Sequence, residues 1–336
     1  MVNYNVVFAT EVGSETDFEY EYITEVLLRD VKINQILSKN NSDHAVQKND
    51  AIIIYSCNRR NLSDDQHQIF KVFDKPILMH LSNENQNHKS RYYKKAKAVL
   101  RSASWNPYTF YPKVYTVPVG FQSGYLNKSP DSLSFIDRKY IWCFAGAMKF
   151  DRHEMLKSFS DITPHWTFQS KGWQGSTYKT TSELIEVYKS SVFAPSPFGN
   201  INFECFRTME ALEWGCIPVT VKFLGEDCHK YIFGAHPFIV ADNWDAAAEV
   251  VRSYLLNPDA LYKKQKEVFE WYQKFKDSLA RDVNKIVQEE FEGLEGTQFD
   301  YQKRLKYNYK LKWKFTKHFM LKWYFQIFFD KIKMIK

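Results

Sequence analysis

The chain has 336 residues, of which 44% are hydrophobic and 25% charged, as in ordinary soluble globular proteins. This length fits two domains of about 150 residues each. No stretch approaches the roughly 20 apolar residues of a membrane-spanning helix, and the start lacks the pattern of a signal peptide. The five cysteines are odd in number and form no Cys-x-x-Cys pair, which supports neither a disulfide framework nor a zinc site. We therefore expect a protein of the reducing cytoplasm.

The formal net charge of +7 is concentrated at the C-terminus. Residues 303–336 contain eleven Lys or Arg and a single acid, Asp330. The preceding 302 residues then hold 35 basic and 38 acidic side chains, a balance of −3. The globular part is slightly acidic, and the basicity belongs to a tail.

Short apolar runs alternate with helical stretches along the chain. Predicted strands lie at residues 6–9, 51–56, 76–81, 114–119, 140–146, 165–168, 191–195, 217–221 and 237–241. Predicted helices lie at residues 17–37, 61–73, 86–100, 151–160, 180–190, 203–214 and 244–256. Several strands are apolar throughout, which is typical of strands covered on both faces. The alternation predicts parallel sheets built from strand–helix–strand units.

The polar stretch at residues 122–139, which carries Gly, Pro, Ser and Asp, is the expected domain border. We expect two Rossmann-like α/β domains, residues 1–130 and 131–296, followed by a basic helical tail, residues 297–336. The two domains are expected to face each other across a cleft, with ligands beyond the carboxyl ends of the strands.

The most informative segment is SVFAPSPFGNINFECFRTMEALEWGCIPVTV, residues 191–221. It predicts a strand, a loop, a helix closed by Gly215, and a second strand. The start of that helix favours an anion. Arg207 and Glu210 are three residues apart and share one helix face. A guanidinium can hold diphosphate oxygens and a carboxylate can accept ribose hydroxyls, although a solvated ion pair is the simpler alternative.

This segment resembles the exostosin family of glycosyltransferases, whose members carry a strand ending in Pro, a Gly loop and R-x-x-E-A-L-x-x-G-C-I-P-V. It is especially similar to the C-terminal half of the ribitol xylosyltransferases of the dystroglycan pathway, which share the run around Cys205. The resemblance implies a two-domain GT-B fold that binds a nucleotide sugar in its second domain. It also implies an inverting reaction with a UDP-linked sugar as co-substrate and no separate cofactor. The residues that it places at the donor are Pro195, Gly199, Asn202, Glu204, Arg207 and Glu210.

The segment FAGAMKFDRHEML, residues 144–156, adds two donor-binding candidates. It resembles the segment that opens the donor domain in the same family. Gly146 would let the backbone approach a phosphate or sugar, and Arg152 would add positive charge. A tight turn at Gly146 is the alternative.

An inverting transfer needs a general base that removes the proton of the acceptor hydroxyl. The segment that begins HLSNEN at His80 is similar to a family loop, but Asn83 stands where an Asp is common. Asn83 cannot act as a base, so Glu84 is the preferred candidate and His80 a second one. The carboxylates that follow the first strand also compete: Glu11, Glu15 and Asp17. Each carboxylate could instead be a solvated loop residue, and His80 a core histidine.

We expect no essential metal ion. No Asp-x-Asp pair stands at a strand end, and the histidines form no zinc-binding pair. The run DNWD at residues 242–245 has the wrong spacing, and its Asp242 or Asn243 is read as a helix cap.

The tail interleaves cations with aromatic residues, and the apolar run FMLKWYFQIFF covers residues 319–329. Lys306, Lys310, Lys314 and Lys317 form one helical stripe. This pattern predicts a helix lying on an anionic membrane, where each lysine contributes about 1 kcal/mol. Packing onto the first domain, an oligomer contact and binding of single-stranded nucleic acid are the alternatives, and the acidic body disfavours nucleic acid.

Together these features predict a peripheral glycosyltransferase on the inner face of the cell membrane. Its acceptor would be a cell-surface polysaccharide or a lipid-linked glycan. The first alternative is a non-catalytic GT-B-like module that binds a nucleotide sugar or a glycan, as the loss of a carboxylate at Asn83 would allow. The second alternative is a nucleic-acid-binding protein with a basic tail.

Overall fold

The computed structural model describes residues 4–8, 18–38, 51–56, 75–82, 93–102, 113–170, 179–199 and 203–288. The chain forms two compact units, one of residues 1–119 with 278–336 and one of residues 120–277. The second unit shares residues 131–277 with the expected second domain. The predicted helix at 61–73 and the tail lie outside the described residues.

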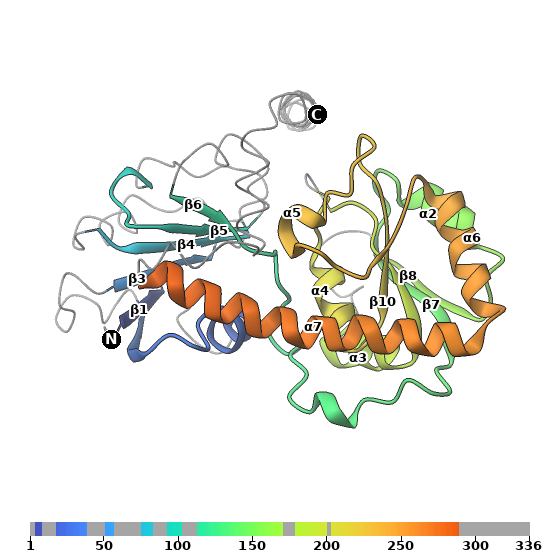
Figure 1. Ribbon diagram of the computed structural model, residues 1–336, viewed down its shortest axis with the longest axis horizontal. Coiled ribbons are helices and arrows are strands. Elements are labelled where there is room, and N and C mark those ends of the chain that lie inside the picture. Colours follow the sequence, from blue (N-terminus) through green and yellow to red (C-terminus); the bar gives the residue numbers. More distant parts are fainter. Residues whose placement is uncertain are drawn as a thin grey trace, which may run out of the picture. The chain divides into compact units, whose positions relative to one another are not determined.

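The first unit contains a sheet of six strands in the order β2-β1-β3-β4-β5-β6 (Figure 1). The strands are β1 (Tyr4–Phe8), β2 (Ile33–Ser38), β3 (Ala51–Ser56), β4 (Ile77–Leu81), β5 (Val99–Arg101) and β6 (Val114–Thr116). All neighbours in this sheet are parallel. Every residue of β1 and β4 is buried, as the continuous apolar runs predict.

Two helix predictions in the first unit are wrong. The stretch 17–37 contains only a short π-helix, η1 (Tyr22–Leu27), and then forms strand β2. No Gly or Pro marks the turn between η1 and β2, so the sequence pattern does not show where the helix ends. The stretch 86–100 ends in the start of strand β5, a three-residue buried strand that is too short to show a period of two.

The second unit contains a parallel sheet of five strands in the order β11-β10-β9-β7-β8. The strands are β7 (Tyr140–Ala147), β8 (His165–Ser170), β9 (Ser191–Pro195), β10 (Ile217–Val221) and β11 (Ile239–Ala241). Strand β8 lies on one side of β7, and the chain then returns to place β9 on the other side. The order of the strands therefore reverses between β7 and β9. The expectation of two α/β domains with parallel sheets is confirmed, whereas a cleft between them stays a prediction.

Helices α2 (Arg152–Phe159), α3 (Thr181–Lys189), α4 (Phe206–Glu213), α5 (Lys230–Phe233) and α6 (Trp244–Leu255) belong to the second unit (Figure 1). Helix α2 packs against α6, and both α3 and α4 pack against β9. Asn243 caps α6 by accepting a hydrogen bond from the amide of Ala246 at 2.9 Å, as the sequence predicts. A capping box between Thr180 and Glu183 starts α3.

Helix α4 ends at the predicted glycine. Gly215 has φ of 70°, and its amide donates to the carbonyl oxygen of Leu212 at 3.1 Å. The amide of Cys216 donates to the carbonyl oxygen of Ala211 at 3.0 Å, which completes a Schellman motif. Because α4 follows the loop that leaves the carboxyl end of β9, its start at Phe206 lies at that end of the sheet.

Helix α7 (Pro258–Val287) is 30 residues long, or roughly 45 Å. It starts at a proline, which suits the first turn of a helix. Lys276 of α7 donates to both carboxylate oxygens of Glu213 in α4, at 3.1 and 3.0 Å, and Glu213 is fully buried. In the described part of the chain no helix is long and apolar enough to cross a membrane.

Candidate nucleotide-binding site

The predicted donor residues of the second unit gather where the strand order reverses. Strand β7 ends at Ala147 and β9 ends at Pro195, side by side in the sheet. Helix α4 begins at Phe206, a short loop beyond β9. In open parallel sheets, ligands bind beyond the carboxyl ends of the strands at such a reversal point. The positive end of the α4 dipole adds a preference for an anion.

Arg207, in the first turn of α4, is the central cation of this site. Its Nε and Nη2 donate to the carbonyl oxygen of Ala145 at 3.0 and 2.6 Å, and its guanidinium lies 4.5 Å from the centre of the Phe144 ring. Nη1 contacts the sulfur of Cys205 at 3.4 Å, which is a weak acceptor. Among the described residues no carboxylate lies within 4.0 Å of this guanidinium. Its charge is therefore oriented but not neutralised by a direct ion pair.

Gly146 is required by the position of Arg207. A Cβ atom at Gly146 would lie 2.6 Å from Nη2 of Arg207 and 3.4 Å from Nη1 of Arg152. The sequence predicts that Gly146 lets the backbone approach a ligand closely. In the structure the space that the missing side chain leaves is filled by a guanidinium.

Arg152 and Asp151 hold the loop that follows β9. Arg152 donates to the carbonyl oxygens of Ala147 at 2.5 Å and Phe198 at 2.9 Å. Asp151 accepts from the amide of Phe198 at 3.2 Å and from the indole of Trp244 at 3.0 Å. Burial raises the pKa of Asp151, although these donors oppose the shift. Both side chains therefore fix the shape of the loop next to Arg207.

Glu210 lies one turn after Arg207 and is buried, with 6% of its surface exposed. Its Oε2 accepts a hydrogen bond from the hydroxyl of Tyr188 at 3.4 Å. Burial raises the pKa of Glu210 to about 7, against the opposing effects of the Arg207 charge and the Tyr188 hydroxyl. The side chain is thus poised to be either neutral or charged near neutral pH.

The remaining donor candidates have less specific surroundings. Pro195, Gly199 and Glu204 are all buried beside the start of α4. Asn202 lies outside the described residues. The same holds for most of the predicted bases: Glu11, Glu15, Asp17 and Glu84.

His80, in strand β4, is the one candidate base that the structure describes. It is 3% exposed, and its Nδ1 lies 2.7 Å from Nη1 of Arg101 and 2.5 Å from the hydroxyl of Tyr93. A guanidinium cannot accept a proton, so Nδ1 acts as the acceptor of that hydrogen bond. This arrangement matches the reading of His80 as a core histidine.

Three side chains contribute to the site without a role predicted for them from the sequence. Phe144 forms the platform under Arg207, Cys205 contacts its Nη1, and Asp151 secures the loop. Phe144 and Asp151 stand in the same run as Gly146 and Arg152, but nothing in their types signals a ligand site. The partners of Phe144 and Asp151 lie 47 to 93 residues away in the sequence, which a local pattern does not reveal.

The described side chains around Arg207 are mostly cationic, aromatic or hydrogen-bonded to the backbone. Within the described ranges, no group of three or more His, Cys, Asp or Glu side chains could hold a metal ion. Cations and helix amides are the groups that it offers to an anionic ligand.

Comparison with known proteins identifies relatives of this half of the chain. Residues 126–292 match the family model described as the RXYLT1 C-terminal domain. Ribitol-5-phosphate xylosyltransferase 1 of the mouse is 25% identical over 178 residues, which cover 46% of this chain. The matched region spans 39% of the mouse protein.

Solved structures align over more of the chain but at low similarity. An α1,3-fucosyltransferase shares 10% identity, covers 85% of this chain and 90% of its own, and has a TM-score of 0.49. Anabaena Alr3699/HepE in complex with UDP and glucose shares 9% identity, covers 85% of this chain and 100% of its own, and has a TM-score of 0.47. T4 phage BGT in complex with UDP and Mn²⁺ shares 8% identity, covers 85% of this chain and 99% of its own, and has a TM-score of 0.48. All three scores lie below 0.5, so the description of the fold rests on the strands and helices themselves.

The family match includes β7, β9 and α4, and thus all of the residues that surround Arg207. The C-terminal half of this chain is therefore related to the C-terminal domain of the ribitol-5-phosphate xylosyltransferases.

Proposed function

We propose that this protein is a glycosyltransferase that takes a sugar from a nucleotide diphosphate donor. The observation that carries the proposal is Arg207, an oriented cation at the reversal point of a parallel sheet and at the start of a helix. A diphosphate leaving group develops negative charge as the glycosidic bond breaks, and positioned donors that stabilise this charge accelerate transfer. The relation to a xylosyltransferase domain supports the same activity.

The donor would place its diphosphate beside Arg207, whose Nη1 donates to the sulfur of Cys205, a weak acceptor, and to no other described residue. The first amides of α4 would add hydrogen bonds without a bound metal. Glu210 would accept the ribose hydroxyls, which donate best to its charged form. A diphosphate in this place replaces the contact with Cys205 and leaves the Ala145 contact as the support of the guanidinium.

The finer features of the reaction follow the family resemblance. We propose a UDP-linked sugar as donor and inversion at the sugar carbon, with Glu84 as the base that deprotonates the acceptor hydroxyl. The acceptor would be a cell-surface polysaccharide or a lipid-linked glycan. The basic tail would hold the enzyme on the anionic inner face of the cell membrane.

A nucleotide panel tests the donor proposal. UDP and UDP-sugars should raise the melting temperature of the full chain, because a ligand that binds only the folded state stabilises it. Turnover of a UDP-sugar should persist in excess EDTA if no metal takes part. Stabilisation by no nucleotide would refute the donor site. Nucleotide binding without turnover on any glycan acceptor would refute the transferase activity and leave a binding module.

A further inference from the structure

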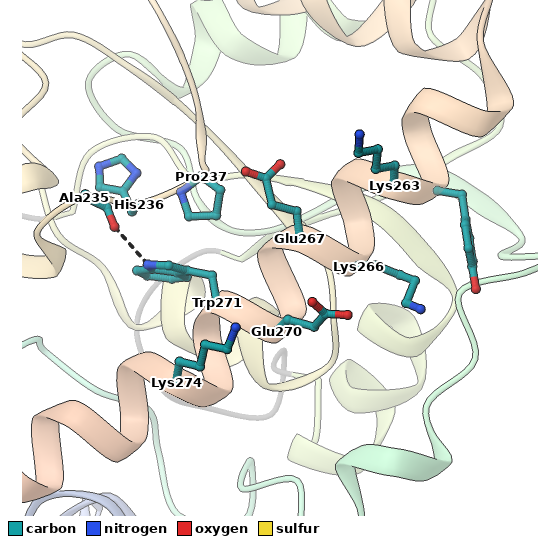
Figure 2. Close-up of a pocket in the computed structure, with 10 residues that line it drawn as sticks. Ala235, His236, Pro237, Lys263, Lys266, Glu267, Glu270, Trp271 and Lys274 are labelled. Atoms are coloured by element: carbon teal, nitrogen blue, oxygen red, sulfur yellow. Dashed lines mark hydrogen bonds between the residues drawn. The ribbon is translucent and has the colours of Figure 1, made fainter.

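A groove lies on the surface of the second unit, on residues that the proposed reaction does not use. Its volume is about 750 Å³, and it lies between α7 and the segment Ala235–Pro237 (Figure 2). Trp271 lines it and is anchored there, because its indole nitrogen donates to the carbonyl oxygen of Ala235 at 2.9 Å. The ring of Trp271 also stacks on Phe275. The aromatic lining is therefore rigid.

The charges of the groove follow one face of α7. Lys263, Lys266 and Lys274 all line it, and the first and last of them are separated by about 16 Å along the helix. None of the three makes an ion pair with a described carboxylate. Figure 2 shows Glu267 and Glu270 on the stretch of helix between Lys266 and Lys274. The lining is thus positive at both ends and carries carboxylates between them.

An aromatic ring extends the groove at its far end. Tyr262 is 44% exposed, and Nζ of Lys266 lies 5.8 Å from the centre of its ring. Side-chain entropy makes an exposed lysine costly to fix, but a lysine already beside a ring loses less of it on binding. Tyr262 and Trp271 then offer two apolar surfaces nine residues apart on one helix.

We propose that this groove binds an anionic polysaccharide whose negative groups are separated by uncharged, hydroxyl-bearing sugars. The lysines match the negative groups, the rings match the apolar faces of sugars, and Glu270 accepts hydrogen bonds from hydroxyls. Glu267 is paired with Lys264 at 3.1 Å and contributes less net charge. A nucleic acid, with a phosphate at every nucleotide, would meet the two carboxylates in the middle of the groove.

This binding is independent of sugar transfer, so either could hold without the other. A hyaluronan oligosaccharide, which carries a carboxylate on alternate sugars, is a suitable probe. Dextran of equal length and oligothymidylate serve as neutral and nucleic-acid comparisons. All are tested on the full chain. Because the tail of residues 303–336 also attracts anions, the readout must be local: the rate of acetylation of each lysine, resolved by mass spectrometry.

Hyaluronan should slow the acetylation of Lys263, Lys266 and Lys274 but not that of Lys157, an exposed lysine of α2. Replacing Lys263 and Lys274 by Glu should weaken hyaluronan binding by about tenfold or more. The matched change of Lys139 and Lys157 to Glu alters the net charge equally and should have little effect. Tyr262→Ala should weaken binding, whereas Tyr262→Phe should preserve it.

Equal losses of hyaluronan affinity in the two double variants would overturn the proposal, because the attraction would then depend on the net charge of the protein and not on the groove. Unchanged acetylation at the three groove lysines would overturn it as well. Equal protection by dextran would show that the charges do not matter. Stronger protection by oligothymidylate than by hyaluronan would assign the groove to nucleic acid instead.

Discussion

Arg207 is a side chain whose position depends on three backbone and side-chain partners rather than on an opposite charge. Its guanidinium is tied to the carbonyl oxygen of Ala145 and lies over Phe144. Such an arrangement keeps the cation available for a ligand and reduces the loss of conformational freedom on binding. It also means that Lys is a poor substitute, because an ammonium cannot reproduce the fork of contacts.

Replacing Arg207 with Ala should weaken binding of the stabilising nucleotide by about 2 kcal/mol, as expected for a lost charge-assisted contact. Arg207→Lys should recover only part of the affinity. Isothermal titration calorimetry measures both. Arg252→Ala is the control, because Arg252 in α6 pairs with two exposed carboxylates away from the site, Glu249 of the same helix and Asp161 in the turn after α2. An affinity of Arg207→Ala equal to that of the control would contradict the donor site.

Gly146→Ala should lower nucleotide affinity without contacting the nucleotide. The added Cβ would meet Nη2 of Arg207 at 2.6 Å and force the guanidinium away from Ala145. We expect a loss of about tenfold, or 1.4 kcal/mol. Gly225→Ala is the matched control, because Gly225 has φ of 83° but nothing within 4 Å. Gly225→Ala should lose stability and keep its nucleotide affinity. If Gly225→Ala lost affinity and Gly146→Ala kept it, Gly146 would not be what positions the guanidinium of Arg207.

Glu210 should make the stability of the protein fall as the pH rises. Its folded pKa of about 7 lies above the ordinary value of 4.5, so the folded state binds the proton more tightly than the unfolded state. The resulting stabilisation is complete below about pH 4.5 and is lost as the pH rises toward 7, by on the order of 3 kcal/mol. Urea unfolding between pH 5 and 8 measures this slope.

Glu210→Gln should remove that contribution, so that the difference from the wild type grows with pH. Glu249→Gln, a change at an exposed residue of α6, should leave the slope unaltered. If the wild type and Glu210→Gln show parallel profiles, the carboxyl group is already ionised at pH 5.

At the scale of elements, helices α4 and α7 are joined by a buried ion pair. Glu213 accepts from Lys276 through both oxygens and from the hydroxyl of Tyr272 at 2.6 Å. The backbone amide of Asn127 donates to the same carboxylate at 3.2 Å. These donors fix the far end of α4 and hence the direction in which its first turn points.

Lys276→Met should destabilise the protein by about 3 to 5 kcal/mol, because it leaves the buried Glu213 carboxylate without its cation. Adding Glu213→Gln should restore much of the loss. Chemical denaturation of both variants is the measurement, with Lys189→Met at an exposed pair as the control. Failure of the second change to restore stability would show that packing of Lys276, rather than its charge, is what matters.

The sequence predicts the second unit better than the first. In the second unit, Pro195, Gly215 and the apolar strands mark every boundary near the site, and Arg207 and Glu210 could be identified from their spacing. The residues of β7 that contact Arg207 could not be identified from the sequence, because these contacts depend on which strands become neighbours in the sheet. In the first unit, the predicted helices at 17–37 and 86–100 run into strands β2 and β5, because no Gly or Pro in the sequence marks where each strand starts.

At the scale of the whole molecule, the tail should be separable from the fold. All described helices and strands end by residue 287, whereas the eleven cations lie beyond residue 302. A chain that ends at residue 302 should therefore stay folded and lose binding to anionic vesicles. Binding of the full chain should weaken as salt screens the attraction.

Co-sedimentation with vesicles, at low and high ionic strength, compares the two chains, and circular dichroism reports their folding. Vesicles of neutral lipid are the control. Unfolding of the shortened chain together with an absence of vesicle binding by the full chain would make the tail a structural segment. Equal vesicle binding by both chains would assign the membrane contact to another surface.

Helix α7 has a consequence for how the protein is made. The hydroxyl of Tyr4 in β1 donates to the carbonyl oxygen of Val287, a partner 283 residues later in the chain. At the usual speed of a ribosome this partner is synthesised on the order of 15 to 60 seconds after β1. The second unit is continuous from residue 120 to 277 and can fold before that moment. Strand β1 can pair with β2 and β3 as soon as residue 56 has been made, but its contact with the end of α7 forms only late in synthesis.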